Sequence, residues 1–313
     1  MNKFKYIVYK FTFGALLRVP DVFYSVLFAA VFPIYKALHT KRAYGRVVKH
    51  LEAAKKYMET QGQDSGPMQK VTARDVFKGI YWNALDSYRG LARFKSVTRR
   101  IVYENEEIIR NAVDECAKAG KPIAGISIHQ GSFELLHRAL CRYSEHVHLI
   151  TDSVGDEAFR KCLEDLRSDT HLTEYHPEET GRLIRDLFKT KGILAMVYDQ
   201  GKNTKGNTVE LFGRPTTLYL RLLQKVNEMG AGIVTFRTWT EDTPERRIVI
   251  RFEKYYPPHY DKIIGENAPA DVKNTESPLL GAIARETERW IAEHPDQWSW
   301  NYHGNFLNLT PRL

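Results

Sequence analysis

The stretch from Ile123 to Tyr143 reads IAGISIHQGSFELLHRALCRY. Its first six residues are apolar or small, which is typical of a buried strand. Gly131 interrupts this run, and Ser132 is a residue type that caps helices. The following residues place Phe133 and two leucines on one helical face. The stretch therefore predicts a buried strand, a tight turn and a helix.

His129 and Glu134 lie at the two ends of this predicted turn. On one continuous helix they would point about 140° apart. A strand-to-helix turn lets them meet at the sheet edge where α/β proteins bind ligands. A carboxylate on one imidazole nitrogen leaves the other nitrogen basic, so the pair could take a proton from a hydroxyl. The alternative is that Glu134 only complements the helix dipole and that His129 is structural.

Three further blocks follow in the chain. The predicted strand 192–198 ends in Asp199 and Gln200, at the same expected sheet edge as His129, although Asp199 could simply close an Asx turn. Residues 210–217 read ELFGRPTT, in which the Arg214 guanidinium could hold a phosphate or carboxylate, or form a structural salt bridge. Residues 294–306 read HPDQWSWNYHGNF.

The His-x4-Glu pair resembles the motif of the glycerolipid and lysophospholipid acyltransferase superfamily. With the three blocks in order, the chain is more specifically similar to the bacterial lipid A biosynthesis (lauroyl/myristoyl) acyltransferases. It departs from them at Tyr198, where proline is usual before Asp-Gln, and at residues 303–305, where a basic pair is usual. The resemblance implies a glycerolipid acyltransferase-like fold: an α/β domain with a mixed central sheet flanked by helices and with membrane-facing helices at its N-terminus.

The resemblance also implies an activity. A fatty acyl chain would move from an acyl thioester, carried by acyl carrier protein or coenzyme A, to a hydroxyl of a lipid A precursor at the cytoplasmic face of the bacterial inner membrane. His129 would be the general base and Glu134 would orient it. Another lipid acceptor (a lysophospholipid, an aminolipid or a mannosylated phosphoinositide) and a non-catalytic membrane-binding protein of the same fold are the alternatives.

Substrate-binding residues are expected around this pair. The family has a functional arginine in a helix after the second strand; Arg167 is the first match in the predicted helix 156–167 and Arg160 the second, although either could lie on a solvated face. Backbone N–H groups near Gly131 to Phe133, at the start of the predicted helix, could stabilise an oxyanion. The full expected set is Arg167, Arg160, Asp199, Gln200, Arg214, Gly131 and Ser132.

Residues 1–60 carry 11 Lys/Arg and 3 Asp/Glu, a net charge of +8, whereas the remaining residues carry 35 of each sign. This distribution argues against a nucleic-acid-binding body and favours a segment at an anionic membrane surface. The apolar run 22–38 contains Pro33, which leaves about a dozen uninterrupted residues, fewer than the ~20 that span a bilayer. We expect an anchoring segment over residues 1–60 that lies at the membrane interface or inserts shallowly, with a short spanning helix as the alternative, and a catalytic domain over residues 61–313.

Other classes of site find no support in the sequence. The three cysteines show no paired spacing, which favours a reducing compartment over a disulfide framework. Neither a phosphate-binding Gly-rich loop nor a Gly-x-Ser-x-Gly elbow is present. His171 and His176 lack partners at metal-ligand spacing. We expect no cofactor and no metal.

Overall fold

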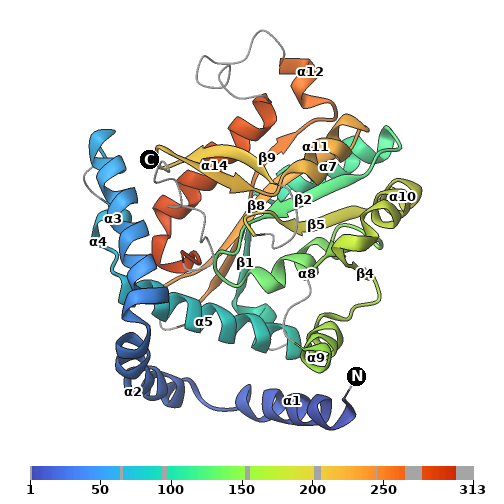
Figure 1. The fold of residues 1–313 in the computed structure, drawn as a ribbon. Helices are drawn as coiled ribbons and strands as arrows, with labels where there is room; N and C mark the ends of the chain where they lie inside the picture. Colours follow the sequence, from blue (N-terminus) through green and yellow to red (C-terminus); the bar gives the residue numbers. More distant parts are fainter. Residues whose placement is uncertain are drawn as a thin grey trace.

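The computed structural model describes residues 2–63, 66–93, 97–151, 156–200, 206–243, 245–264 and 277–300. A seven-stranded mixed sheet with the order β1-β9-β8-β2-β5-β3-β4 forms its centre (Figure 1). The strands of this sheet are β1 (Ile101–Glu104), β2 (Ile123–Ser127), β3 (Val147–Ile150), β4 (Leu172–Tyr175), β5 (Ile193–Val197), β8 (Gly232–Thr240) and β9 (Ile248–Tyr256). Only the β8–β9 pair is antiparallel, so β1 and β9 run opposite to the other five strands.

The α-helices surround this sheet in the order α1 (Lys3–Leu16), α2 (Asp21–His39), α3 (Gly45–Thr60), α4 (Pro67–Lys70), α5 (Ala73–Ala92), α7 (Glu106–Lys118), α8 (Leu136–Leu140), α9 (Glu157–Arg167), α10 (Thr180–Thr190), α11 (Arg221–Glu228), α12 (Tyr260–Ile264) and α14 (Pro278–Glu293). Short 3₁₀ turns are η2 (Thr98–Arg100), η3 (Phe133–Leu135), η4 (Pro177–Glu179) and η6 (Pro295–Gln297), and η1 (Thr40–Tyr44) is a π-helical turn. The expected α/β architecture with a mixed sheet is confirmed.

Both faces of the central strand β2 are buried, as its apolar sequence predicts. Ala124, Ile126 and Ile128 face the larger core, to which α3, α10, α11 and α14 contribute. Ile123 faces a second core formed with α7 and α8. Helices on both faces leave only the strand ends open, so polar groups there become the candidates for a site.

A second, two-stranded sheet is formed by β6 (Asn207–Leu211) and β7 (Arg214–Leu218). Phe212 and Gly213 connect the strands, and both have positive φ, as a two-residue hairpin turn of type I′ requires. The hairpin packs on α14, and the Tyr57 ring of α3 contacts Phe212. The sequence predicted the block 210–217 but not that it forms a hairpin.

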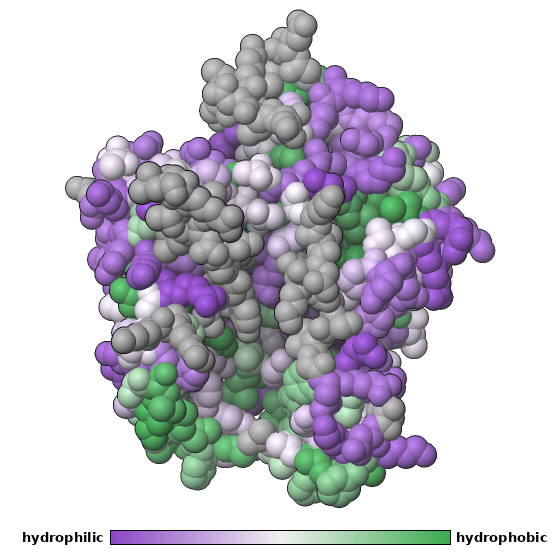
Figure 2. Space-filling model, viewed as in Figure 1, coloured by the Kyte–Doolittle hydropathy of each residue, from purple (hydrophilic) through white to green (hydrophobic). Residues whose placement is uncertain are grey.

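The N-terminal helices expose their apolar sides. In α1, Phe4, Ile7, Val8 and Phe11 form one exposed stripe, although this spacing usually marks the buried side of a helix. The opposite side docks on α9: the Tyr9 ring packs on Phe159. In Figure 2 the lower surface, where α1 and α2 lie in Figure 1, is largely apolar.

The helix α2 is continuous over 19 residues, with Pro33 inside it. The sequence reading counted the apolar run as interrupted at Pro33, but the helix continues through this residue. By length and composition α2 could cross a membrane. However, an aromatic ladder holds it along α5: Tyr24 and Phe28 pack on Tyr81, and Phe32 packs on Phe77. Its exposed apolar residues are Val22, Phe23, Val26, Leu27, Val31, Ile34 and Leu38.

The helix α3, the last part of the expected anchoring segment, has a different environment. Val47, Leu51, Ala54 and Met58 are buried in the larger core of the sheet. The exposed apolar surface of the segment is therefore confined to α1 and α2.

Candidate active site

The strands β2 and β5 are parallel neighbours, paired from Ile123 with Ile193 to Ser127 with Val197. His129 follows β2 and Asp199 follows β5, so the two side chains meet at one edge of the sheet. Nδ1 of His129 lies 2.6 Å from Oδ1 of Asp199, and the backbone N–H of His129 donates to both carboxylate oxygens at 3.0 and 3.1 Å. The expectation that both residues share this edge is met.

The environment of Asp199 decides the chemistry of the imidazole. The carboxyl group is fully buried, and Oδ2 also accepts the indole N–H of Trp298 at 2.9 Å. Because a carboxylate only accepts hydrogen bonds, we assign the imidazole proton to Nδ1, which leaves Nε2 of His129 with its lone pair. The His129 side chain is 17% exposed, and its ring packs edge-on against Phe133 at 4.5 Å.

The carboxylate that binds the His129 imidazole is thus that of Asp199 and not, as the sequence suggested, that of Glu134. The Glu134 carboxylate instead accepts hydrogen bonds from Nε and Nη2 of Arg167, both at 2.8 Å. Nη1 of Arg167 donates to Glu174 at 3.0 Å. Burial alone would raise the pKa of Glu134, but Arg167 outweighs burial and holds that pKa below its usual value. Glu134 also interacts electrostatically with His129.

This ion-pair cluster explains why the sequence reading of Glu134 failed. η3 begins at Phe133, so Glu134 sits in its first turn as expected, but the turn directs its carboxylate towards the end of α9. Arg167 is the last residue of α9. Arg167 therefore contacts Glu134, and its Nε, Nη1 and Nη2 atoms all donate to protein carboxylates.

Gly131 makes the turn between β2 and η3 possible. Its φ is +57°, and a Cβ atom here would lie 2.4 Å from the carbonyl oxygen of Thr238. Its N–H donates to the carbonyl oxygen of Gln297 at 3.0 Å, so it cannot serve an oxyanion as expected. Ser132 precedes η3 without capping it, contrary to the sequence reading, and its buried hydroxyl finds no partner within the described residues.

The remaining expected binding residues lie in three different settings. Arg160 is on α9, with Nε 3.7 Å from Glu164 and a side chain 38% exposed. The side-chain nitrogen of Gln200 is buried and has no partner in the described part of the chain. Arg214 begins β7, in the hairpin and not in the sheet that carries His129. Residues 303–305, where the family usually has a basic pair, lie outside the described residues.

The segment after α14 contributes contacts that sequence reasoning missed. Gln130 forms an isolated antiparallel bridge with Trp298, and its Nε2 donates to the carbonyl oxygen of Trp290 at 2.8 Å. The Gln297 amide pairs with both backbone groups of Thr240 at 2.8 Å. The motif Pro-Asp-Gln-Trp-Ser-Trp is part of the block 294–306 that the sequence singled out, but the sequence assigned no contact with the site to its aromatic residues. Trp298 and Trp300 are buried.

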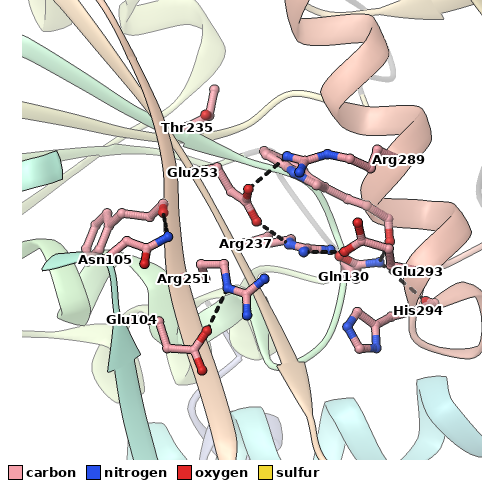
Figure 3. A network of polar contacts seen from close by, with 12 residues as sticks. Glu104, Asn105, Gln130, Thr235, Arg237, Arg251, Glu253, Arg289, Glu293 and His294 are labelled. Atoms are coloured by element: carbon pink, nitrogen blue, oxygen red, sulfur yellow. Dashed lines mark hydrogen bonds and ion pairs between the residues drawn. The ribbon is translucent and has the colours of Figure 1, made fainter.

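An ion-pair network built on the buried Arg237 and Glu253 fixes the end of α14 against the sheet, beside Gln130 (Figure 3). Arg237 of β8 donates to Glu253 of β9 at 2.6 Å and also binds Glu293 at the end of α14. Arg289 of α14 reaches the same Glu253 at 2.8 Å. Breaking buried pairs of this kind is costly, so the network holds α14 and the segment that follows it in one place.

Comparison with known proteins identifies a family for the chain. The family model described as bacterial lipid A biosynthesis acyltransferase matches residues 92–306, which include His129, Glu134, Asp199 and the segment after α14. No curated protein sequence matches the chain. Since the family model covers more than half of the 313 residues, the chain belongs to the bacterial lipid A biosynthesis acyltransferase family.

Proposed function

We propose that the protein is a membrane-associated O-acyltransferase in which His129 is the general base. The observation that carries the proposal is the hydrogen bond between Nδ1 of His129 and the buried Asp199 carboxylate. It keeps Nε2 basic in a partly exposed ring at the sheet edge, which suits proton transfer from an acceptor hydroxyl. The acceptor is a hydroxyl of a lipid A precursor, and the donor is an acyl thioester, most simply acyl-acyl carrier protein.

The reaction needs no covalent enzyme intermediate. Nε2 of His129 takes the hydroxyl proton while the oxygen attacks the thioester carbonyl. When the carbon–sulfur bond breaks, the same proton passes to the leaving thiolate, so an ester and a free thiol are formed. Asp199 stabilises the imidazolium that exists between these steps, and Glu134 supports the same positive charge from a second side.

Arg214, Arg160 and Gln200 are proposed to contact the substrates. Arg214 and Arg160 offer guanidinium groups that bind phosphate in two-pronged geometry, which lysine cannot copy. If either arginine grips phosphate equally in the ground and transition states, its replacement by lysine raises KM and leaves kcat nearly unchanged. Arg167 is instead proposed to hold Glu134, because its guanidinium already binds two protein carboxylates.

The exposed stripes of α1 and α2 are proposed to enter the headgroup region of the inner membrane on its cytoplasmic face. The aromatic contacts between α2 and α5 run along the helix from Tyr24 to Phe32. A spanning orientation of α2 would have to break this ladder, whereas an in-plane orientation preserves it. The in-plane arrangement therefore fits these contacts better, and the excess of Lys/Arg in residues 1–60 favours anionic lipid.

The test is acyl transfer by the full chain in anionic lipid vesicles, with radiolabelled acyl-acyl carrier protein and a lipid A precursor. We expect labelled lipid from the wild type and a loss of about 10² or more in turnover from His129→Ala. His146→Ala is a matched control, because His146 is an exposed histidine just before β3. Transfer to a lysophospholipid but not to the lipid A precursor would show that the proposed acceptor is wrong. Undiminished turnover by His129→Ala would refute the mechanism.

A further inference from the structure

Asp199 can orient His129 only if its own carboxylate is held in one rotation. A carboxylate has two equivalent oxygens, and in this site each has its own donors. Oδ1 takes the imidazole N–H, and Oδ2 takes the indole N–H of Trp298 at 2.9 Å. The backbone N–H of His129 is shared between the two oxygens, so it does not distinguish them.

We propose that Trp298 is a positioning residue, which holds Asp199 in the rotation that presents Oδ1 to the His129 imidazole. This inference rests on the proposed role of His129 as the base. Without the indole N–H, Oδ2 would be a fully buried charged atom that has lost a side-chain hydrogen bond. Such an atom costs free energy, so the carboxylate would turn towards other donors and release Nδ1 of His129.

Backbone hydrogen bonds of Trp298 and of the residue before it fix the position of Trp298. Its backbone bridges to Gln130, the residue next to His129. The preceding carbonyl, of Gln297, accepts the N–H of Gly131 at 3.0 Å and the side-chain nitrogen of Asn83 at 3.1 Å. The donor and the turn that carries the base are thus parts of one hydrogen-bonded unit, so the indole cannot move independently of His129.

Trp300 offers a matched comparison. It is as buried as Trp298, and the two rings pack edge-on at 4.8 Å. Its indole N–H, however, donates to the carbonyl oxygen of Pro295 and not to Asp199. Trp298→Phe and Trp300→Phe therefore remove the same chemical group from the same apolar cluster, and only the first changes the Asp199 carboxylate.

The first experiment measures which ring nitrogen of His129 carries the proton. Ring ¹⁵N shifts of histidine-labelled protein in detergent micelles distinguish an Nδ1–H from an Nε2–H tautomer. We expect the Nδ1–H form of His129 in the wild type and in Trp300→Phe, and an added Nε2–H population in Trp298→Phe. Ring signals unaltered by Trp298→Phe, or altered equally by Trp300→Phe, would overturn the proposal. If Trp298→Phe does not fold, benzothienylalanine at position 298 keeps the ring size and removes only the N–H.

Acyl transfer gives a second readout. Trp298→Phe should lower kcat about tenfold to a hundredfold while KM changes less than about twofold, because only the orientation of the base is lost. In an Asp199→Asn background the same substitution should have no further effect, whereas a purely structural tryptophan would act equally in both backgrounds. If the wild type transfers no acyl group, the proposed function fails, and the histidine spectra still decide the role of Trp298.

Discussion

Nδ1 of His129 lies 2.6 Å from Oδ1 of Asp199, although the two residues come from different strands and are separated by 70 positions in the chain. This contact, and not the nearby Glu134, determines which imidazole nitrogen carries the proton. The two carboxylates of the site thus make separate contacts: Asp199 binds the His129 ring, and Glu134 forms an ion pair with Arg167. Their replacement should therefore have different consequences.

Asp199→Asn should lower kcat by about 10² to 10⁴, with little change in KM, because the amide can no longer hold the imidazole in the reactive tautomer. Glu134→Gln should act mainly on stability. Loss of the charge opposite Arg167 should reduce the free energy of unfolding by about 3 kcal/mol. The reduction is smaller to the extent that Glu174 still neutralises the Arg167 charge. Steady-state kinetics and urea unfolding of both variants test this division. A Glu134→Gln protein that is inactive but fully stable would reverse the two assignments.

Gly131→Ala should be severely destabilising. The new Cβ would lie 2.4 Å from the carbonyl oxygen of Thr238, and alanine is strained at a φ of +57°. We expect the free energy of unfolding to fall by at least about 2 kcal/mol. Gly181→Ala in α10 is the control, because a Cβ there meets no atom within 4 Å, and it should be neutral or stabilise by up to about 1 kcal/mol. Thermal unfolding compares the two, and equal stability would contradict the tight turn.

Ile34→Glu should release the protein from anionic vesicles. Ile34 is 63% exposed on α2, so the charge costs little in the folded protein but opposes insertion into the headgroup region. Ile263→Glu on α12 is the control: that side chain is 60% exposed but lies at the opposite end of the molecule from α2 (Figure 1). Vesicle sedimentation measures binding. Equal binding of both variants would place the membrane contact elsewhere.

The stability of the protein should fall between pH 7 and pH 4. Burial lowers the pKa of His137 from 6.5 to about 4, with Arg167 and Arg138 opposing its protonation and Glu134 and Asp169 favouring it. Between these two pKa values His137 is protonated in the unfolded chain but neutral in the folded protein. The contribution of neutral His137 to stability is therefore fully present above pH 6.5 and is lost as the pH falls towards 4. The loss is at most about 1.4 kcal/mol per pH unit for one proton.

His137→Gln should flatten that dependence. Part of the dependence should remain, because burial also lowers the pKa of His294 to about 4. Urea unfolding at a series of pH values measures the slope. If the free energy of unfolding changes with pH equally in the wild type and in His137→Gln, protonation of His137 does not cause the pH dependence.

The sequence predicted the elements whose pattern is long or strongly apolar. β2 and β5 lie close to where the apolar runs placed them, and α9 matches the helix predicted over residues 156–167. β1 and β4 were missed. Each has only four residues and lies at an edge of the sheet, so neither forms a long buried run, and β1 joins directly to the helical pattern of α7.

The site could be predicted in its residues but not in its pairing. His129 and Asp199 were placed at one sheet edge because both end apolar strands. Which carboxylate meets the imidazole depends on β2 lying next to β5, and the local sequence does not specify the order of strands. Trp298 was missed as a site residue for a similar reason, since nothing near it in the sequence shows that its indole reaches Asp199.

The indole of Trp298 has a consequence for biosynthesis. It follows every described strand of the main sheet in the chain, of which the last, β9, ends at Tyr256. During translation, the strands that carry His129 and Asp199 are therefore synthesised before Trp298, the hydrogen-bond donor to Asp199. On the proposed roles, a nascent chain could fold its sheet and still lack an ordered base. Activity would begin only when the segment after α14 has left the ribosome and docked.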